Sequence, residues 1–202
     1  METRPATTDD IDRVARCITL AFASDPVWEP ALRRGDGRTD HHEPYWRLFV
    51  EDAVEQGGVS MTAGGEAVAV WIPPGGVELS AARLRSFESM IAAALDADGV
   101  TELHALFERF EASRAPLGPH YYLSLLATDP EHRGRGIGQA LLAEDLGRWD
   151  VAGVPAYLES TNAANDHRYV RAGFRPIGGF ETIREPTWIT AMWREVGGVA
   201  TV

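Results

Sequence analysis

The segment 121–142, which reads YYLSLLATDPEHRGRGIGQALL, constrains the possible folds of this chain more than any other stretch. The apolar run 121–127 predicts a buried strand, and Pro130 ends it because proline has no N–H for a sheet ladder. A glycine-rich stretch, 133–138, follows, and then a helical pattern. One face of that helix carries Ile137, Leu141, Leu142 and Leu146. The segment therefore predicts a strand, a glycine-rich loop and a helix in immediate succession.

A glycine-rich loop that opens a helix is a suitable place to bind an anion. The first backbone N–H groups of a helix have no intrahelical partner, and the aligned peptide dipoles place about half a positive charge there. Glycine has no side chain that would keep phosphate oxygens away from these groups. We therefore expect a phosphate-bearing ligand at residues 133–139.

Two nucleotide-binding motifs fit the segment poorly. A P-loop needs a lysine after its last glycine, and this chain contains no lysine. A dinucleotide fingerprint needs GxGxxG directly after the strand and an acidic residue about 20 residues further on. Glu159 meets the second condition, but the glycines are spaced GxGxG and DPEHR separates them from the strand. A nucleotide-dependent oxidoreductase is therefore an alternative with little support.

The stretch RGRGIG, 133–138, matches in full the pattern Gln/Arg-x-x-Gly-x-Gly/Ala and resembles the acetyl-CoA loop of the GCN5-related N-acetyltransferases. The resemblance implies an α/β (α+β) fold with a mixed, mostly antiparallel central sheet flanked by helices. It also implies acetyl-CoA as cosubstrate, without a metal. The amides facing the pyrophosphate would belong to Arg133, Gly134, Arg135, Gly136, Ile137, Gly138 and Gln139. Arg133 and Arg135 would add the charge of their guanidinium groups.

A second motif, 162-NAANDHRYVRAGF-174, resembles another helix of that family. Asn165 and Tyr169 are four residues apart and share a helix face. The resemblance implies that Asn165 bonds the pantetheine arm and that the Tyr169 hydroxyl lies near the thioester sulfur. A thiol of pKa about 8.5 leaves more readily when a proton is delivered to it. Arg168 departs from the family, which more often has Phe there.

The central strand and its surroundings supply the other expected site residues. The resemblance implies that main-chain groups of Leu126, Ala127 and Thr128 pair with pantetheine. Removing a proton from a lysine-like amine at pH 7 costs about 4–5 kcal/mol, against about 1 kcal/mol for an α-amino group. An acceptor with a lysine-like amine therefore needs a positioned base to remove its proton. Glu159, at the end of its strand, and His120, acting through water, are the candidates, although a solvated carboxylate and a packed histidine are the alternatives.

The acceptor side of the site is expected to involve the loop 24–44. Asp25 would attract a cationic substrate, or else simply form the turn before Pro26, and Trp28 would contact the acceptor. The adjacent pair His41 and His42 suggests no metal site, because neighbouring side chains in a loop point apart and no third ligand is evident. The loop itself is rich in Pro, Gly and charge, so it is predicted to be irregular and exposed.

Length, charge and cysteine content limit the number of domains, the partners and the metal sites that this chain can have. A chain of 202 residues predicts one domain, 1–196, followed by a frayed tail, 197–202. The net charge of −11 argues against nucleic acid or an anionic membrane as partner. A single cysteine, Cys17, excludes an internal disulfide and a cysteine-based metal cluster. Neither an export signal nor an apolar span is evident, so we expect a cytoplasmic protein, either a monomer or a homodimer.

Periodicity and turn residues predict the remaining elements. Helices are expected at 9–23, 45–55, 79–95, 99–113 and 162–171, with a break at Asp98-Gly99 and Leu84 among the buried residues. Strands are expected at 3–6, 59–63, 66–72, 155–160, 174–177 and 187–194. Without the two helices inserted before the central strand, this is the element order of the family named above.

Several segments also look like puromycin N-acetyltransferase and its relatives. These segments are AFASDP at 21–26, AVAVWIPP at 67–74, the stretch 120–142, GVPAYLES at 153–160 and YVRAGF at 169–174. The function implied is direct transfer of acetyl from acetyl-CoA to the primary amine of a small molecule, antibiotic-like or aminoacyl, in a ternary complex. A non-catalytic module that senses acyl-CoA is a further alternative.

Overall fold

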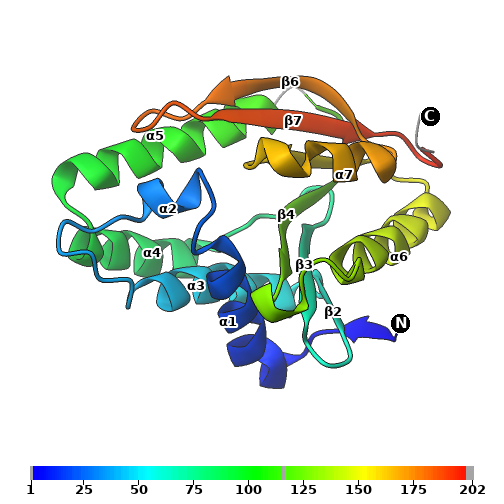
Figure 1. The fold of residues 1–202 in the computed structure, drawn as a ribbon, viewed down its shortest axis with the longest axis horizontal. Coiled ribbons are helices and arrows are strands. Elements are labelled where there is room, and N and C mark those ends of the chain that lie inside the picture. Colours follow the sequence, from blue (N-terminus) through cyan, green and yellow to red (C-terminus); the bar gives the residue numbers. More distant parts are fainter. Residues whose placement is uncertain (1, 115–116, 199–202) are drawn as a thin grey trace.

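The computed structural model describes residues 2–114 and 117–198. Within these ranges one mixed sheet runs in the order β1-β2-β3-β4-β5-β7-β6, and only the pair β4 and β5 is parallel (Figure 1). Its strands are β1 (Thr3–Pro5), β2 (Val59–Thr62), β3 (Ala67–Ile72), β4 (Tyr121–Thr128), β5 (Ala156–Ser160), β6 (Arg175–Glu181) and β7 (Trp188–Arg194). The expected mixed, mostly antiparallel sheet is confirmed.

Helices cover both faces of this sheet, and two of them are inserted before β4 as expected. The α-helices are α1 (Ile11–Phe22), α2 (Trp28–Ala31), α3 (His42–Glu55), α4 (Ala81–Ala94), α5 (Ala97–Arg114), α6 (Ile137–Ala152) and α7 (Asp166–Arg171). Single turns of 3-10 helix are η1 (Thr8–Asp10), η2 (Pro130–His132) and η3 (Ala163–Asn165). No helix within the described ranges is both long enough and apolar enough to cross a membrane.

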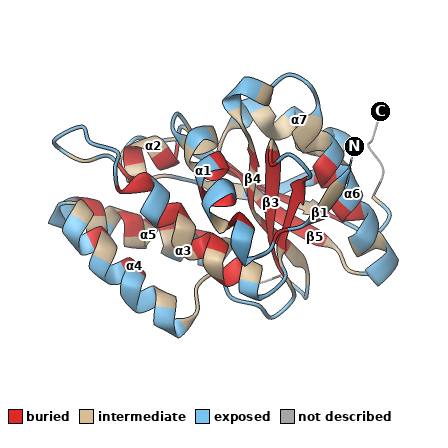
Figure 2. Cartoon of the chain, turned by 90° about the horizontal axis from the view of Figure 1, so that it is seen from below, coloured by how far each residue is buried: buried red, intermediate tan, exposed pale blue. Residues whose placement is uncertain are grey.

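Alternation along β3 divides the core into two layers. Ala69 and Trp71 pack with α6 residues such as Leu142, whereas Val68 and Val70 pack with α1 and α3. Figure 2 shows these buried strands between the two groups of helices. The α1 and α3 layer is rich in aromatic rings, which continue under α2 and α5.

A bulge in the middle of β4 lies next to the point where β4 and β5 separate. Val70 pairs with Leu125 and Trp71 pairs with Leu123, so Ser124 is the extra residue. The parallel pairing of β4 with β5 covers only residues 121–123 and 156–158. Beyond this point the two strands separate, and the side of β4 that faced β5 has no strand partner among the described residues.

The prediction for 24–44 was wrong in part, because this loop contains α2 and several buried side chains. Asp25 Oδ1 accepts hydrogen bonds from the amides of Val27 (2.9 Å) and Trp28 (3.1 Å), which starts the helix. Val27, Trp28 and Leu32 then dock on the aromatic core with no more than 7% of their surface exposed. Long-range packing overrides the local Pro, Gly and charge content here.

Two predictions for the inserted helices were also wrong. Asp98-Gly99 does not separate them, since Asp96 Oδ1 accepts from the Gly99 amide (2.7 Å) and α5 already begins at Ala97. Leu84 is 46% exposed, because α4 buries Phe87 and Ile91 instead. At the end of the chain, Asp150 accepts a hydrogen bond from the Gly197 amide. Residues 199–202 of the expected tail lie outside the described residues.

Candidate active site

A cavity of about 750 Å³ lies where β4 and β5 separate. The glycine-rich loop and the first turn of α6 form one side of it, and η3 and α7 form another. Side chains from α1, α2, α3 and α5 close the remaining side. One cavity therefore connects the predicted anion site with the predicted acceptor side.

The glycine-rich loop leaves the start of α6 open. Gly134 and Gly136 adopt left-handed backbone conformations, with φ of +77° and +73°, which glycine tolerates best. No side chain caps the N-terminus of α6, so its first amides face the cavity without a side-chain partner. A Cβ on Gly138 would come within 2.5 Å of Thr128 Oγ1. The loop thus combines free amides with three positions that favour glycine, two because of their backbone conformation and one because of limited space.

Most of the residues predicted for the site line this one cavity. They are Asp25, Trp28, Leu126, Thr128, Arg133, Gly134, Gly136, Ile137, Gly138, Gln139, Glu159, Asn165 and Tyr169. His120, Ala127 and Arg135 are not among the lining residues.

Each of these three has other contacts. Ala127 is buried in the α1 and α3 layer. The Arg135 guanidinium donates to the Glu131 carbonyl (3.4 Å). The His120 ring packs against Tyr157 and Trp193, bonds the Gly118 carbonyl through Nδ1 (2.7 Å), and has its pKa lowered by burial.

Arg133 lines the cavity, but its guanidinium is turned toward α1. It donates to the Ala21 carbonyl (2.7 Å), one of the unpaired carbonyls at the end of that helix. The charge contact with pyrophosphate that we expected from this side chain stays a prediction, and it would require the guanidinium to leave the Ala21 carbonyl. The glycine-rich loop and the start of α6 line the cavity together with Arg168 and Arg171.

Glu159 lies on the acceptor side of the sheet. Leu158 faces α6, so its neighbour Glu159 shares the opposite face with Tyr157. Glu159 Oε1 accepts a hydrogen bond from the Tyr157 hydroxyl (2.8 Å), whereas the buried Oε2 has no protein partner. Burial raises the pKa of Glu159 to about 8, despite the opposing charge of Arg114. A carboxyl group with this pKa can exchange protons near neutral pH.

A half-buried polar cluster lies beside Glu159, and the sequence did not reveal it. Arg114 lies 3.2 Å from Glu78 and places its guanidinium 4.3 Å from the centre of the Tyr122 ring. Ser124, the bulged residue, donates to Glu78 (2.6 Å). Glu78 follows a Pro-Gly turn and belongs to no recognisable motif, so nothing in the sequence pointed to it. Tyr157 could have been found, because a residue two before Glu159 on a strand shares its face.

Asn165, at the end of η3, and Tyr169, on α7, both line the cavity. The Tyr169 ring packs edge-on against Phe174, with 6.2 Å between ring centres. Burial raises the pKa of Tyr169 to about 12, so its hydroxyl keeps its proton at neutral pH. Asn165 Oδ1 accepts from Arg168 (2.9 Å), the residue that departs from the family pattern.

Asp25 is committed to local structure. Its Oδ1 holds the start of α2, and its Oδ2 accepts from the Thr161 hydroxyl (2.8 Å) at the end of β5. Burial raises the pKa of this carboxyl group. Both oxygens are therefore engaged, and Asp25 positions Trp28 beside the cavity rather than offering a free charge.

Comparison with known proteins agrees with this geometry. Residues 90–176 match the acetyltransferase (GNAT) domain family. A Corynebacterium glutamicum structure described as histone acetyltransferase HPA2 and related acetyltransferase is 25% identical, with a TM-score of 0.64 over 99% of this chain and 96% of its own.

Two insect proteins share the fold at lower identity. Drosophila melanogaster polyamine N-acetyltransferase, which forms N-acetylagmatine, is 12% identical, with a TM-score of 0.66 over 96% of this chain and 99% of its own. Arylalkylamine N-acetyltransferase 2 from Aedes aegypti is 14% identical, with a TM-score of 0.65 over 96% and 98%. The family match over residues 90–176 and the shared fold make this chain similar to GNAT-type N-acetyltransferases.

Proposed function

We propose that this protein transfers the acetyl group of acetyl-CoA directly to the primary amine of a small molecule in a ternary complex. The observation that carries the proposal is the continuous cavity, which joins the uncapped start of α6 to the unpartnered oxygen of Glu159. A phosphate-bearing donor and an amine acceptor would meet inside it. Acetyl-CoA supplies the activated acetyl thioester.

The residues around the loop fit coenzyme A. The free amides at the start of α6 suit a pyrophosphate group. The unpaired side of β4, from Leu126 to Thr128, offers main-chain donors and acceptors to a pantetheine amide, and Asn165 adds a side-chain amide. One of the β4 amides would also polarise the thioester carbonyl. Because Gly138 has no side chain, the start of α6 can lie close to Thr128 at the end of β4.

Glu159 is the proposed proton acceptor. Glu159 lines the cavity, and its buried Oε2 has no protein partner, so an incoming ammonium group would supply the missing hydrogen bond. The proton passes to the carboxylate, and the neutral amine then attacks the thioester carbonyl. Because burial raises the pKa of Glu159 to about 8, the carboxylate is basic enough for this step near neutral pH.

Tyr169 is the proposed proton donor to the departing sulfur. As the C–N bond forms and the C–S bond breaks, the thiolate takes the phenolic proton and the attacking nitrogen loses its second proton to solvent. Solvent then returns a proton to the tyrosine, and Glu159 releases its own proton. A tyrosine pKa of about 12 keeps the donor protonated throughout the working pH range. Full proton transfer to the thiolate is uphill by about 5 kcal/mol, since a thiol has a pKa of about 8.5. The tyrosine therefore first stabilises the negative charge on sulfur through its hydrogen bond.

The acceptor is proposed to be a small molecule, because the cavity is enclosed by helices on its acceptor side. The polyamine and arylalkylamine acetyltransferases with the same fold support this class. The segments that look like puromycin N-acetyltransferase agree with an antibiotic-like or aminoacyl amine.

A thiol-release assay tests the proposal. Purified protein and acetyl-CoA are incubated with puromycin, aminoglycosides, polyamines, arylalkylamines and peptides with free N-termini. We expect amine-dependent release of coenzyme A together with an acetylated product. Tight acetyl-CoA binding without release from any amine would favour a sensing module. Quenching of tryptophan fluorescence by NADH, but not by acetyl-CoA, would favour an oxidoreductase.

A further inference from the structure

The acceptor side of the cavity is walled by aromatic rings. They come from α1, α2, α3 and α5, and the sequence had pointed to only one of them, Trp28. The six lining rings are Phe22, Trp28, Trp46, Phe49, Phe107 and Phe110. Two of these come from α5, one of the inserted helices, so the insertion shapes the acceptor side of the cavity directly.

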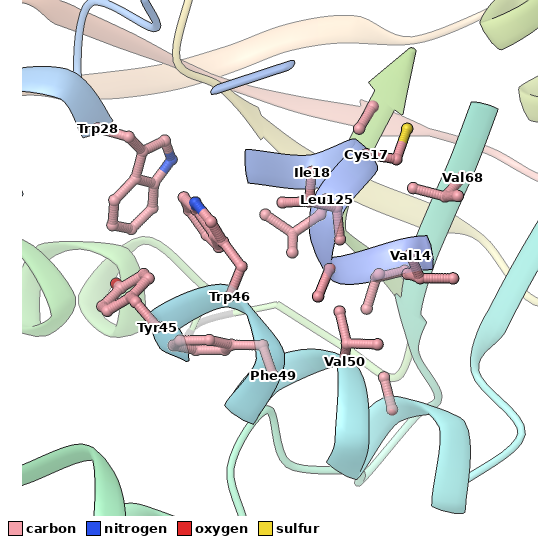
Figure 3. Packing of buried hydrophobic residues seen from close by; sticks show 14 of the residues in the cluster. Val14, Cys17, Ile18, Trp28, Tyr45, Trp46, Phe49, Val50, Val68 and Leu125 are labelled. Carbon is pink, nitrogen blue, oxygen red and sulfur yellow. The ribbon is translucent and has the colours of Figure 1, made fainter. Parts of the chain in front are cut away.

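The rings are arranged in a way that suits a further ring. Trp28 and Phe110 lie nearly parallel, with 5.9 Å between centres and 6° between planes. Trp46 meets Trp28 edge-on at 5.2 Å. Figure 3 shows the two indoles beside each other, with Tyr45 and Phe49 next to them. Aromatic rings favour stacked and edge-on neighbours over other apolar groups of the same size, so this wall selects for a ring.

The carboxylates of the cavity limit the number of positive charges that the acceptor can carry. Asp25, Glu78 and Glu159 are its lining carboxylates within the described residues. Both oxygens of Asp25 are hydrogen-bonded within the protein, and Glu78 is paired with Arg114 and Ser124. Only Glu159 offers an oxygen without a partner. A second ammonium or guanidinium group would therefore enter a site with no free counter-charge.

We propose that the acceptor is an aryl monoamine, with its ammonium group at Glu159 and its ring among Trp28, Trp46 and Phe110. This inference rests on the proposed acetyltransferase function and narrows its substrate class. Polyamines, and amines that also bear a guanidinium group, would place a second positive charge among the rings. We therefore expect them to be poor acceptors for this site.

Three amines test the assignment of the acceptor. They are 2-phenylethylamine, 2-cyclohexylethylamine and 1,4-diaminobutane, each assayed by coenzyme A release. We expect kcat/KM for the phenyl compound to exceed that for the cyclohexyl compound about 3- to 10-fold, as ring–ring contacts predict. The excess over diaminobutane should be about 30-fold or more, since that amine buries no ring.

The assay distinguishes failure of the aryl assignment from failure of the proposed acetyltransferase function. Diaminobutane turned over as well as phenylethylamine would overturn the aryl assignment while leaving the acetyltransferase function intact. If a broad amine panel releases no coenzyme A although acetyl-CoA binds, the proposed function itself fails, and the aryl assignment with it.

A matched pair of variants separates a binding role of the rings from a purely structural one. Phe110→Leu removes a ring that lines the cavity, whereas Phe87→Leu removes a ring of the same cluster that does not. We expect Phe110→Leu to reduce the phenyl-to-cyclohexyl preference about 3-fold or more. Phe87→Leu should lower stability but leave the preference unchanged. An unchanged preference in both variants, or an equal change in both, would overturn the inference.

Discussion

The Tyr157 hydroxyl donates a hydrogen bond of 2.8 Å to Glu159 Oε1, and Ser113 of α5 lies 2.8 Å from the same hydroxyl. This chain of contacts fixes one oxygen of the carboxyl group and leaves the other free of protein partners. It also links the proposed base to the inserted helix. The sheet and the insertion therefore act together in positioning Glu159.

Replacing the proposed base should abolish most of the activity. We expect Glu159→Gln to lower kcat/KM about 100-fold or more, because general bases contribute about 10²- to 10⁴-fold. In the natural protein the carboxylate form is required, so kcat/KM should rise with pH through the pKa of about 8. Steady-state assays from pH 6 to 10 should show a rise that levels off near pH 8 in the parent, whereas kcat/KM of the variant should follow the pKa of the acceptor amine, about 10 for an alkylamine. Glu108→Gln, at an exposed position of α5, serves as the control.

The Tyr169 hydroxyl should affect the chemical step and not the binding of the donor. Tyr169→Phe keeps the ring that packs on Phe174 and is expected to lower kcat about 100-fold, with the Kd of acetyl-CoA nearly unchanged. Single-turnover kinetics and calorimetry measure the two quantities. Tyr121→Phe, whose ring stacks on Trp149 away from the cavity lining, is the matched control. Full turnover by Tyr169→Phe would exclude the acid role.

The glycine-rich loop should be sensitive to any added side chain. Gly136→Val introduces a branched residue at φ +73° and fills the entrance to the amides of α6, so acetyl-CoA should bind at least about 10-fold more weakly. Gly37 has nearly the same φ, +72°, with nothing near its Cβ position and no place in the cavity lining. Gly37→Val should therefore strain the backbone without changing the Kd. Equal Kd values in both variants, measured by calorimetry, would argue against the pyrophosphate assignment.

A buried carboxylate on α6 should be important for stability. Asp145 accepts hydrogen bonds from Ser60 of β2 and from the Trp71 indole (2.9 Å), with only 1% of its residue surface exposed. Asp145→Ala leaves buried donors unsatisfied and should lower the free energy of unfolding by about 1–3 kcal/mol. Asp145→Asn keeps an acceptor oxygen and should lose less. Urea unfolding curves compare the two; an alanine variant as stable as its parent would contradict this account.

Local patterns predicted most elements because their causes are local. The apolar run of β4, the glycines before α6 and the hairpin around Gly64 and Gly65 each act over a few residues. The errors arose where distant residues decide the outcome. Trp28 is buried because the α3 and α5 rings receive it, and Leu84 is exposed because α4 docks through Phe87.

The sequence by itself determined the strand, loop and helix that present free amides, since glycine spacing and helix polarity are properties of one continuous segment. Only the tertiary structure decided which carboxylates remain free. Asp25 finds partners on α2 and just after β5, and Glu78 finds partners on α5 and β4, whereas Glu159 keeps one oxygen unpaired. The physical reason is that burial and pairing depend on side chains far apart in the chain, and these also set the pKa of Glu159.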